Sequence, residues 1–179
     1  VKSEYFDDRL IERTGQQISA KSFSMESYQN KVKSLERQIQ ALEEERELKL
    51  KQAKNKLVQA QLKIKIDSID LVAAKTNIAI AKTQFEREET LLNEGISAVK
   101  DVEEKKLKLQ DTEAKLLLKE NKYLANKNDL ANIKLEILRT NVSFADKISK
   151  AQSNMFTAKS SQFDTEAQVS KLENNLSNC

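Results

Sequence analysis

The side chains best suited to recognition chemistry lie around Gly95, one of only two glycines in the chain. Arg87 carries a planar guanidinium that can donate to backbone carbonyls or to a carboxylate, in a fork geometry that Lys does not reproduce. Leu91 offers a small apolar anchor, and Ser97 offers a hydroxyl that both donates and accepts. An Arg, a Leu and a Ser this close together occur in many helices, so it is their position beside Gly95 that makes them candidate contacts with a partner.

Side chains for catalysis or metal binding are scarce. The chain has no His, and its one Cys is the last residue, Cys179, so no intrachain disulfide can form. The acidic residues are expected on exposed helix faces, with no concave site to gather them. No glycine-rich, phosphate-binding loop is present. We therefore expect no enzyme activity, no cofactor and no metal site built from His or Cys.

The elements that must position the Gly95 region are helices. The chain contains no Pro, and Gly15 and Gly95 are its only glycines. Strands and hairpin turns need Gly, Pro, Asn-Gly or Asp-Gly punctuation at intervals of about ten residues. Richness in Lys, Glu, Leu, Ala, Gln and Ile with few aromatics is instead typical of long helices and coiled coils. The composition predicts an all-α chain.

The charge pattern limits the possible partners. Lys and Arg number 31 against 28 for Asp and Glu, a net charge of +3, and both signs alternate along the chain. Nucleic-acid binders gather basic residues on one stripe or block, whereas the densest run here, residues 43–51, carries both signs. No stretch reaches the roughly 18 apolar residues of a membrane span. We expect no nucleic-acid partner and no direct membrane insertion by this segment.

Apolar residues repeat every seven positions on both sides of Gly95. In the first half, the series is Leu50, Leu57, Ile64, Leu71, Ile78, Phe85 and Leu92. Three positions later in the heptad stand Ala53, Ala60, Ala74 and Ala81. In the second half, the series is Val102, Leu109, Leu116, Tyr123, Leu130, Ile137 and Phe144. Sustained heptads predict a left-handed coiled coil, and the small alanines allow two helices to approach closely.

The two series mirror each other about the segment that contains Gly95. Folding the chain back at this point places Leu71 level with Leu116 and Ile64 level with Tyr123. Each series also shifts phase by four inserted residues, between residues 39 and 50 and between residues 137 and 148, at the same height. A parallel rod of two copies gives no reason for such symmetry. The sequence predicts a long antiparallel coiled-coil helical hairpin.

Turn and cap signals divide this hairpin into parts. Residues 93–96 combine Asn and Gly as a helix C-terminal signal, Ser97 is expected to cap the second helix, and Gly15 permits a bend. The predicted parts are a lead-in segment over 1–16, a first arm over 17–92, a tip over 93–97, a second arm over 98–176 and an exit stub over 177–179. A second apolar series on the second arm predicts contact with a third helix from a neighbouring copy: Leu117, Leu124, Ala131, Leu138 and Ala145.

The tip resembles that of the periplasmic adaptor proteins, or membrane fusion proteins, of the HlyD family. Members carry an Arg, a Leu four residues later and a Ser just past the hairpin turn, and Arg87, Leu91 and Ser97 match these positions. The commonest spacing in the family has one more residue between the Leu and the Ser. The turn is therefore expected to be tighter here, or Leu92 to share the role of Leu91. The resemblance covers essentially the whole chain.

The resemblance implies a function and a set of partners. The tip would dock on a TolC-like outer-membrane channel through Arg87, Leu91, Leu92, Gly95 and Ser97. The hairpin would lie in the periplasm between two halves of a lipoyl-like domain, in a protein anchored in the inner membrane of a Gram-negative bacterium. Other domains would contact an inner-membrane transporter for secretion or efflux, and six adaptor copies would assemble on each channel.

A generic structural coiled-coil rod that acts by self-association is the alternative function. Each arm of about 75 residues would extend on the order of 110 Å at 1.5 Å per residue, which suits a spacer of either kind. The flanking residues of the full gene product separate the two hypotheses. Lipoyl-like β motifs on both sides would support the adaptor, and a continuing heptad would support the rod.

Overall fold

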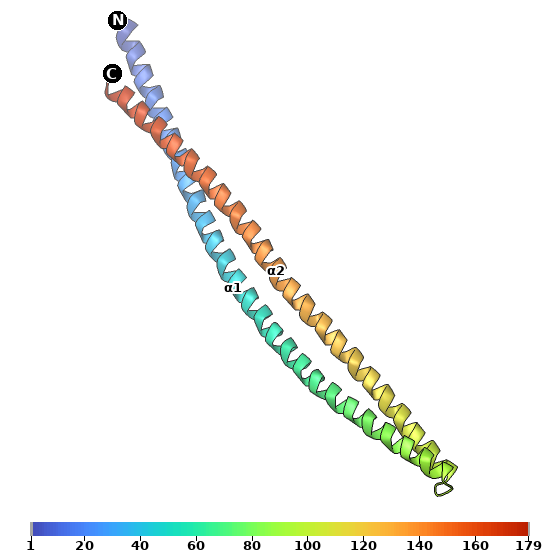
Figure 1. The fold of residues 1–179 in the computed structure, drawn as a ribbon. Helices are drawn as coiled ribbons and strands as arrows, with labels where there is room; N and C mark the ends of the chain where they lie inside the picture. Colours follow the sequence, from blue (N-terminus) through green and yellow to red (C-terminus); the bar gives the residue numbers. More distant parts are fainter. Residues whose placement is uncertain (1, 179) are drawn as a thin grey trace. The chain divides into compact units, whose positions relative to one another are not determined.

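The chain forms two long helices joined by a short turn (Figure 1). The computed structural model describes the backbone of residues 2–178 and the side chains of residues 8–178. Helix α1 spans Lys2–Asn93 and helix α2 spans Val99–Ser177. Residues 2–178 contain no strand. The predicted all-α fold is confirmed.

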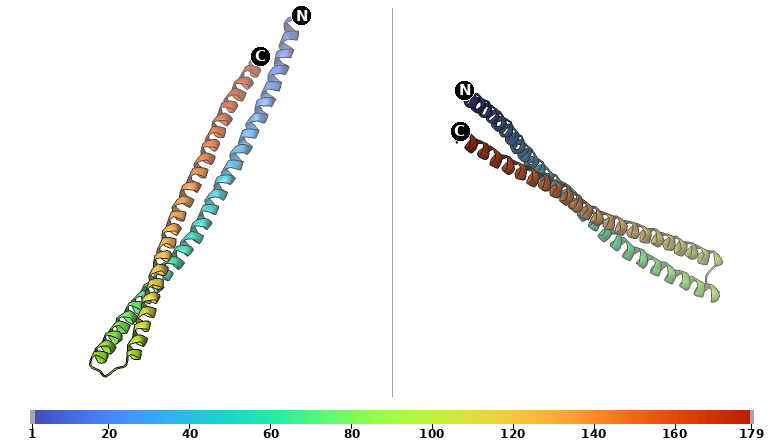
Figure 2. Two further views of the ribbon diagram at one scale, coloured as in Figure 1. Left: turned by 90° about the vertical axis from the view of Figure 1, so that its right-hand side faces the viewer. Right: turned by 90° about the horizontal axis from the view of Figure 1, so that it is seen from above.

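Contacts within the chain divide it into two units. The tip unit comprises residues 50–139, that is, the end of α1, the turn and the first half of α2. The terminal unit comprises residues 1–49 and 140–179. Within each unit, a segment of α1 lies beside a segment of α2 that runs in the opposite direction (Figures 1 and 2). The predicted antiparallel helical hairpin is therefore confirmed.

Small side chains form the most buried part of the tip unit's seam. Every member of the two predicted seven-residue series is half-buried from Leu50 to Leu92 and from Val102 to Ile137. The alanines that share this seam are buried: Ala53, Ala60, Ala74 and Ala81. Two helices make only a thin core, so bulky seam residues keep one side in solvent while the alanines between them are covered. Burial thus follows the predicted heptads.

Cross-helix pairing in the tip unit agrees with the predicted register. The carboxylate of Asp70 lies 3.5 Å from the ammonium of Lys119. This ion pair is within one helical turn of the predicted level of Leu71 and Leu116. Both side chains remain partly exposed, so the pair indicates the register and adds little stability.

Larger side chains are buried in the terminal unit. Phe144 is only 2% exposed, and the ammonium groups of Lys49 and Lys147 lie 5.3 and 5.2 Å from the centre of its ring. At these distances the cations are attracted to the ring faces. Nearby, Arg46 donates to the side-chain oxygen of Asn141 at 3.2 Å. The remaining buried apolar residues of this unit are Val32, Leu35, Ile148, Ala151, Ala158 and Val169.

The predicted phase shift is visible in the burial of α1. Its covered positions run through Ile39, Leu42, Arg46, Leu50 and Ala53. Regular heptads alternate intervals of three and four residues, but here two intervals of four follow each other, on either side of Arg46. The extra interval locally relaxes the supercoil, and a partly exposed Arg can occupy a seam position there.

Residues 2–16 of the predicted lead-in segment are helical and continue into the first arm. Helix α1 begins at Lys2 and passes through Gly15 without a break, so the bend expected there is not an interruption of the helix. One glycine lowers helix stability by only about 1 kcal/mol, which a long helix tolerates. At the other end α2 reaches Ser177, and Cys179 lies outside the described residues. Neither helix of residues 2–178 has a stretch long and apolar enough to cross a bilayer.

Candidate functional site

The turn between the helices has a defined backbone structure. The N–H of Ile96 donates to the C=O of Leu91 at 2.9 Å, and the N–H of Gly95 donates to the C=O of Leu92 at 3.0 Å. These two bonds form the Schellman motif, in which a left-handed residue ends a helix. Gly95 takes that conformation, with a φ of 75°. The helix C-terminal signal predicted over residues 93–96 is confirmed.

Ser97 does not cap α2, contrary to the prediction. The helix starts one residue later, because the C=O of Ala98 accepts the N–H of Asp101 at 3.1 Å and so occupies the capping position. The hydroxyl of Ser97 instead donates to a carboxylate oxygen of Glu88 at 2.6 Å. The tight turn brings Ser97 back over the last turns of α1, where a carboxylate accepts its proton more strongly than a neutral acceptor would. Glu88 was not singled out from the sequence.

The other predicted tip residues lie close together on the last turns of α1. Arg87 is exposed and makes no ion pair or hydrogen bond with the described residues. Leu91 and Leu92 are half-buried. The C=O of Leu91 also accepts the N–H of Ser97 at 3.2 Å, so Leu91 is tied directly to the turn. The arrangement leaves the Arg87 guanidinium free to donate to a partner.

Two apolar residues of the tip were missed from the sequence. Ile96 is 72% exposed and Val99 is 59% exposed. Neither belongs to a seven-residue series, so neither has a place in the seam. Apolar residues that lie outside the heptads and next to the turn signal at Gly95 could have been identified from the sequence as exposed tip residues. The tip therefore exposes more apolar surface than Leu91 alone would provide.

A buried carboxylate lies farther back in the seam of the tip unit. Asp67 is 4% exposed and stands at the heptad position that holds alanine elsewhere in this seam. The side-chain amide of Asn126 donates to its carboxylate, and the ammonium of Lys122 lies 3.8 Å from it. Two donors from α2 thus compensate for the burial of this charge.

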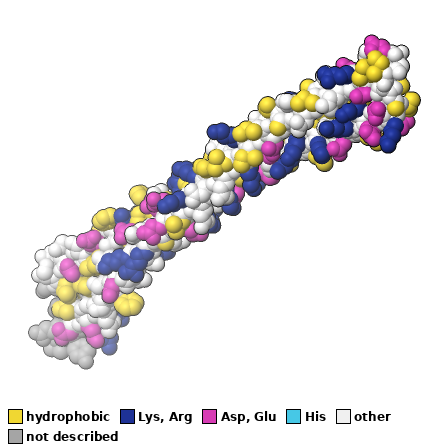
Figure 3. Space-filling model, turned by 90° about the horizontal axis from the view of Figure 1, so that it is seen from below, with side chains coloured by type: hydrophobic (Ala, Val, Ile, Leu, Met, Phe, Trp, Pro, Cys, Tyr) yellow, Lys and Arg dark blue, Asp and Glu magenta, His cyan; other side chains and the backbone are white. Residues whose placement is uncertain are grey.

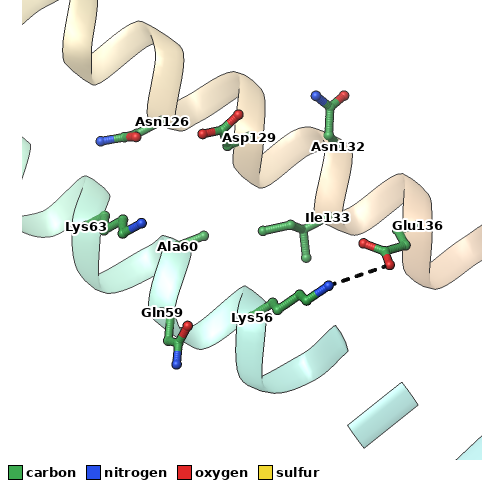
Figure 4. Close-up of a pocket in the computed structure, with 9 residues that line it drawn as sticks. All are labelled: Lys56, Gln59, Ala60, Lys63, Asn126, Asp129, Asn132, Ile133 and Glu136. Atoms are coloured by element: carbon green, nitrogen blue, oxygen red, sulfur yellow. Dashed lines mark ion pairs between the residues drawn. The ribbon is translucent and has the colours of Figure 1, made fainter. Parts of the chain in front are cut away.

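A shallow hollow lies between the helices near this carboxylate (Figure 4). It has a volume of about 350 Å³, and Ile133 of α2 points across it toward Ala60 of α1. At its edge Lys56 and Glu136 form an exposed ion pair at 3.9 Å. Among the described residues, no group of three or more His, Cys, Asp or Glu side chains is placed to hold a metal ion. The lining of the hollow contains no Ser, Thr, Cys or His.

The sides of the tip unit also expose apolar residues. We define the outer face of α1 as six exposed residues at positions between the seam residues: Val58, Leu62, Ile66, Ile69, Val72 and Ile80. The second apolar series predicted on α2 is exposed at each of its five positions, so it takes no part in the seam. Figure 3 shows hydrophobic side chains in scattered patches among charged ones on one face of the molecule.

Threonines extend the outer face of α1 toward the tip. Thr76, Thr83 and Thr90 recur every seven residues, and each hydroxyl donates to the C=O four residues earlier in its own helix, at 2.9 to 3.0 Å. A hydroxyl turned back onto its own helix is not offered to a partner. These positions therefore present methyl groups to solvent.

Comparison with curated proteins and with solved structures finds no match to this chain. A family model does match part of it: residues 69–126 match the CzcB-like, alpha-helical hairpin domain. The matched segment is about a third of the chain, lies within the tip unit and includes the turn. Such hairpin domains occur in adaptors of the membrane fusion protein class. Residues 69–126 are thus similar to the hairpin of a membrane fusion adaptor.

Proposed function

We propose that this chain is the helical hairpin of a periplasmic adaptor, or membrane fusion protein, whose tip docks on a TolC-like outer-membrane channel. The observation that carries the proposal is the turn itself. It lies within the segment that matches an adaptor hairpin domain, and it combines a free guanidinium with exposed apolar side chains. The activity is recognition, and the adaptor links the channel to an inner-membrane exporter.

In this proposal, the predicted tip residues have different parts in docking. Arg87 donates to backbone carbonyls or a carboxylate at the channel entrance, because its fork has no partner within the described chain. Leu91 and Leu92 contribute the apolar surface that remains exposed on the last turn of α1. Gly95 sets the turn that brings these groups to the end of the hairpin. Ser97 acts mainly through its bond to Glu88.

The exposed sides of the hairpin support assembly with further copies of the adaptor. The outer face of α1 and the second apolar series of α2 as far as Leu138 belong to the same unit, and one chain leaves both exposed. When a face of one copy packs against a different face of the next copy, the copies form a closed ring if the rotation between neighbours brings the last copy back to the first. Six copies per channel is the stoichiometry that the resemblance to HlyD adaptors implies.

The finer assignments follow from the same class of adaptor. We place the chain in the HlyD family, in the periplasm of a Gram-negative bacterium. We place the inner-membrane anchor and the transporter contacts on other domains of the full gene product. The similarity to a CzcB-like hairpin favours efflux over secretion as the transport process.

A generic coiled-coil rod that acts by self-association remains the second candidate function. The exposed outer face of α1 is compatible with it, because exposed apolar residues can also mediate self-association. The hairpin disfavours the parallel form of this rod, since each helix already pairs with the other helix of the same chain.

Two substitutions test the docking proposal in the full gene product. Arg87→Ala and Leu91→Ala should leave helicity and transporter association unchanged while recruitment of the channel and export are lost. A Leu to Ala change in such a contact costs about 1 to 2 kcal/mol per copy, and several copies in a ring multiply the loss. Recruitment is measured by co-purification with the channel, with Arg37→Ala, another exposed arginine of α1, as the control. Normal recruitment by both tip variants would refute the proposal.

A further inference from the structure

The turn is held in place by more bonds than a helix end requires. Three backbone N–H groups, those of Gly95, Ile96 and Ser97, donate to the last turn of α1 at 2.9 to 3.2 Å. The Ser97 hydroxyl adds a fourth bond, to the Glu88 carboxylate at 2.6 Å, which is the strong, charge-assisted kind. These bonds fix the backbone on both sides of Ile96.

The fixed turn presents apolar side chains to solvent. Ile96 stands between two residues whose backbone is bonded to α1, yet 72% of its surface is exposed. Val99 begins α2 and is 59% exposed. A side chain on an already ordered segment loses little further freedom on binding, so its burial contributes more fully to affinity. Exposed apolar residues on a rigid turn are thus well suited to be interface anchors.

We propose that Ile96 and Val99 are the main apolar contacts with the channel, and that Glu88 is a positioning residue that acts through Ser97. The inference rests on the proposed docking function and adds these three residues to it. The partner surface is an apolar depression large enough for a branched side chain, with a carbonyl or carboxylate nearby for Arg87. Because its proton is directed to Glu88, Ser97 serves the shape of the turn rather than donating to the partner.

The apolar contact is tested by binding of the full gene product to a purified TolC-like channel from the same organism, immobilised in detergent. Ile96→Ala and Val99→Ala should each weaken binding about tenfold, as expected for truncation of an interface anchor. Val142→Ala is the matched control, because Val142 is a 70% exposed, branched residue of the terminal unit. This control should change binding by less than about twofold, as surface truncations away from an interface do.

The positioning role is tested by a double-mutant cycle on the same binding signal. Glu88→Ala and Ser97→Ala should each weaken binding, and the double variant should bind no more weakly than the worse single variant, because both remove one bond. Glu88→Gln should restore binding relative to Glu88→Ala, since the side-chain oxygen of Gln also accepts the Ser97 proton. All variants should keep the helical circular dichroism of the parent.

The outcomes separate this inference from the docking proposal. If Arg87→Ala abolishes binding while Ile96→Ala and Val99→Ala match the Val142→Ala control, the apolar contact is wrong and docking by the tip stands. If the losses of Glu88→Ala and Ser97→Ala add, Ser97 touches the channel itself and the positioning role is wrong. If the unaltered protein does not bind the channel, both proposals are overturned.

Discussion

At the scale of single residues, the two glycines meet opposite conformational demands. Gly95 has a φ of 75°, in the left-handed region where a Cβ approaches the carbonyl oxygen. Gly15 lies inside α1, where a residue with a side chain, such as Ala, stabilises a helix more than Gly does. Apart from the adjacent backbone, a Cβ at either position would meet no atom within 4 Å. The effect of adding one therefore depends on backbone conformation alone.

Alanine at these two positions should change stability in opposite directions. Gly95→Ala should lower the free energy of unfolding by about 1 kcal/mol, and Gly15→Ala should raise it by about 0.5 to 1 kcal/mol. Urea unfolding followed by circular dichroism measures both changes. Gly95→Asn is the control, since Asn tolerates the left-handed conformation and should cost less than Ala. A stabilising Gly95→Ala would contradict the Schellman turn.

Local signals made the tip only partly predictable at this scale. Gly95 could be assigned from sequence because a glycine after a helix has a local conformational use. Ser97 was assigned to the wrong partner because both roles suit a serine after a turn. The choice between them depends on where the turn places Glu88, nine residues earlier, which no local pattern encodes. The exposure of Ile96 likewise depends on the geometry of the whole turn.

At the scale of the elements, the seam of the tip unit contains one polar interruption. Asp67 replaces the small apolar residue that would complete the alanine series, and Asn126 and Lys122 on α2 supply its partners. A buried charge with its partners in place is weak evidence for stability, since an apolar residue of suitable size often does as well or better. A polar group at one seam position more commonly fixes the register of a coiled coil.

Substitutions on the two helices should therefore have unequal effects. Asn126→Ala should lower the free energy of unfolding by about 1 to 3 kcal/mol, because Asp67 stays buried with a donor removed. Asp67→Ala should be neutral or stabilising. Alanine occupies the same heptad position elsewhere in the seam, and the half-buried side chain of Asn126 can turn to solvent. Urea unfolding compares the two variants. If Asp67→Ala proves the more destabilising, the cluster contributes net stability and the register role is wrong.

Periodicity predicted the elements better than it predicted their surfaces. The seven-residue series identified the seam on both helices because a two-helix seam imposes one period on both. The heptads alone could not identify Asp67 as buried. A carboxylate at a seam position can also indicate that the position is exposed or that the heptad register has shifted. The heptads also gave no weight to residues such as Ile69, because an apolar residue between seam positions has no effect on the heptad reading.

At the scale of the whole chain, the exposed apolar residues bear on self-association. Those of the outer face of α1 are separated along the helix by Lys63, Lys65 and Lys75. Specific interfaces of stable complexes bury about 1,200 to 2,000 Å² in total, with an apolar centre that excludes charge. A face interrupted by lysines meets this requirement poorly. Contacts between such faces gain strength mainly when other domains hold the copies together.

The isolated chain should accordingly be monomeric or only weakly associated at low micromolar concentration. Its main seam is satisfied within one chain, so association has to use exposed apolar residues such as those of the outer face of α1 and of the second apolar series of α2. Sedimentation velocity over a range of concentrations measures the association. Ile69→Lys, which places a charge in the outer face, should abolish whatever weak association is seen, while Phe156→Lys, at an exposed position of the terminal unit, should not. A tight dimer at low micromolar concentration would instead favour the self-associating rod over the adaptor.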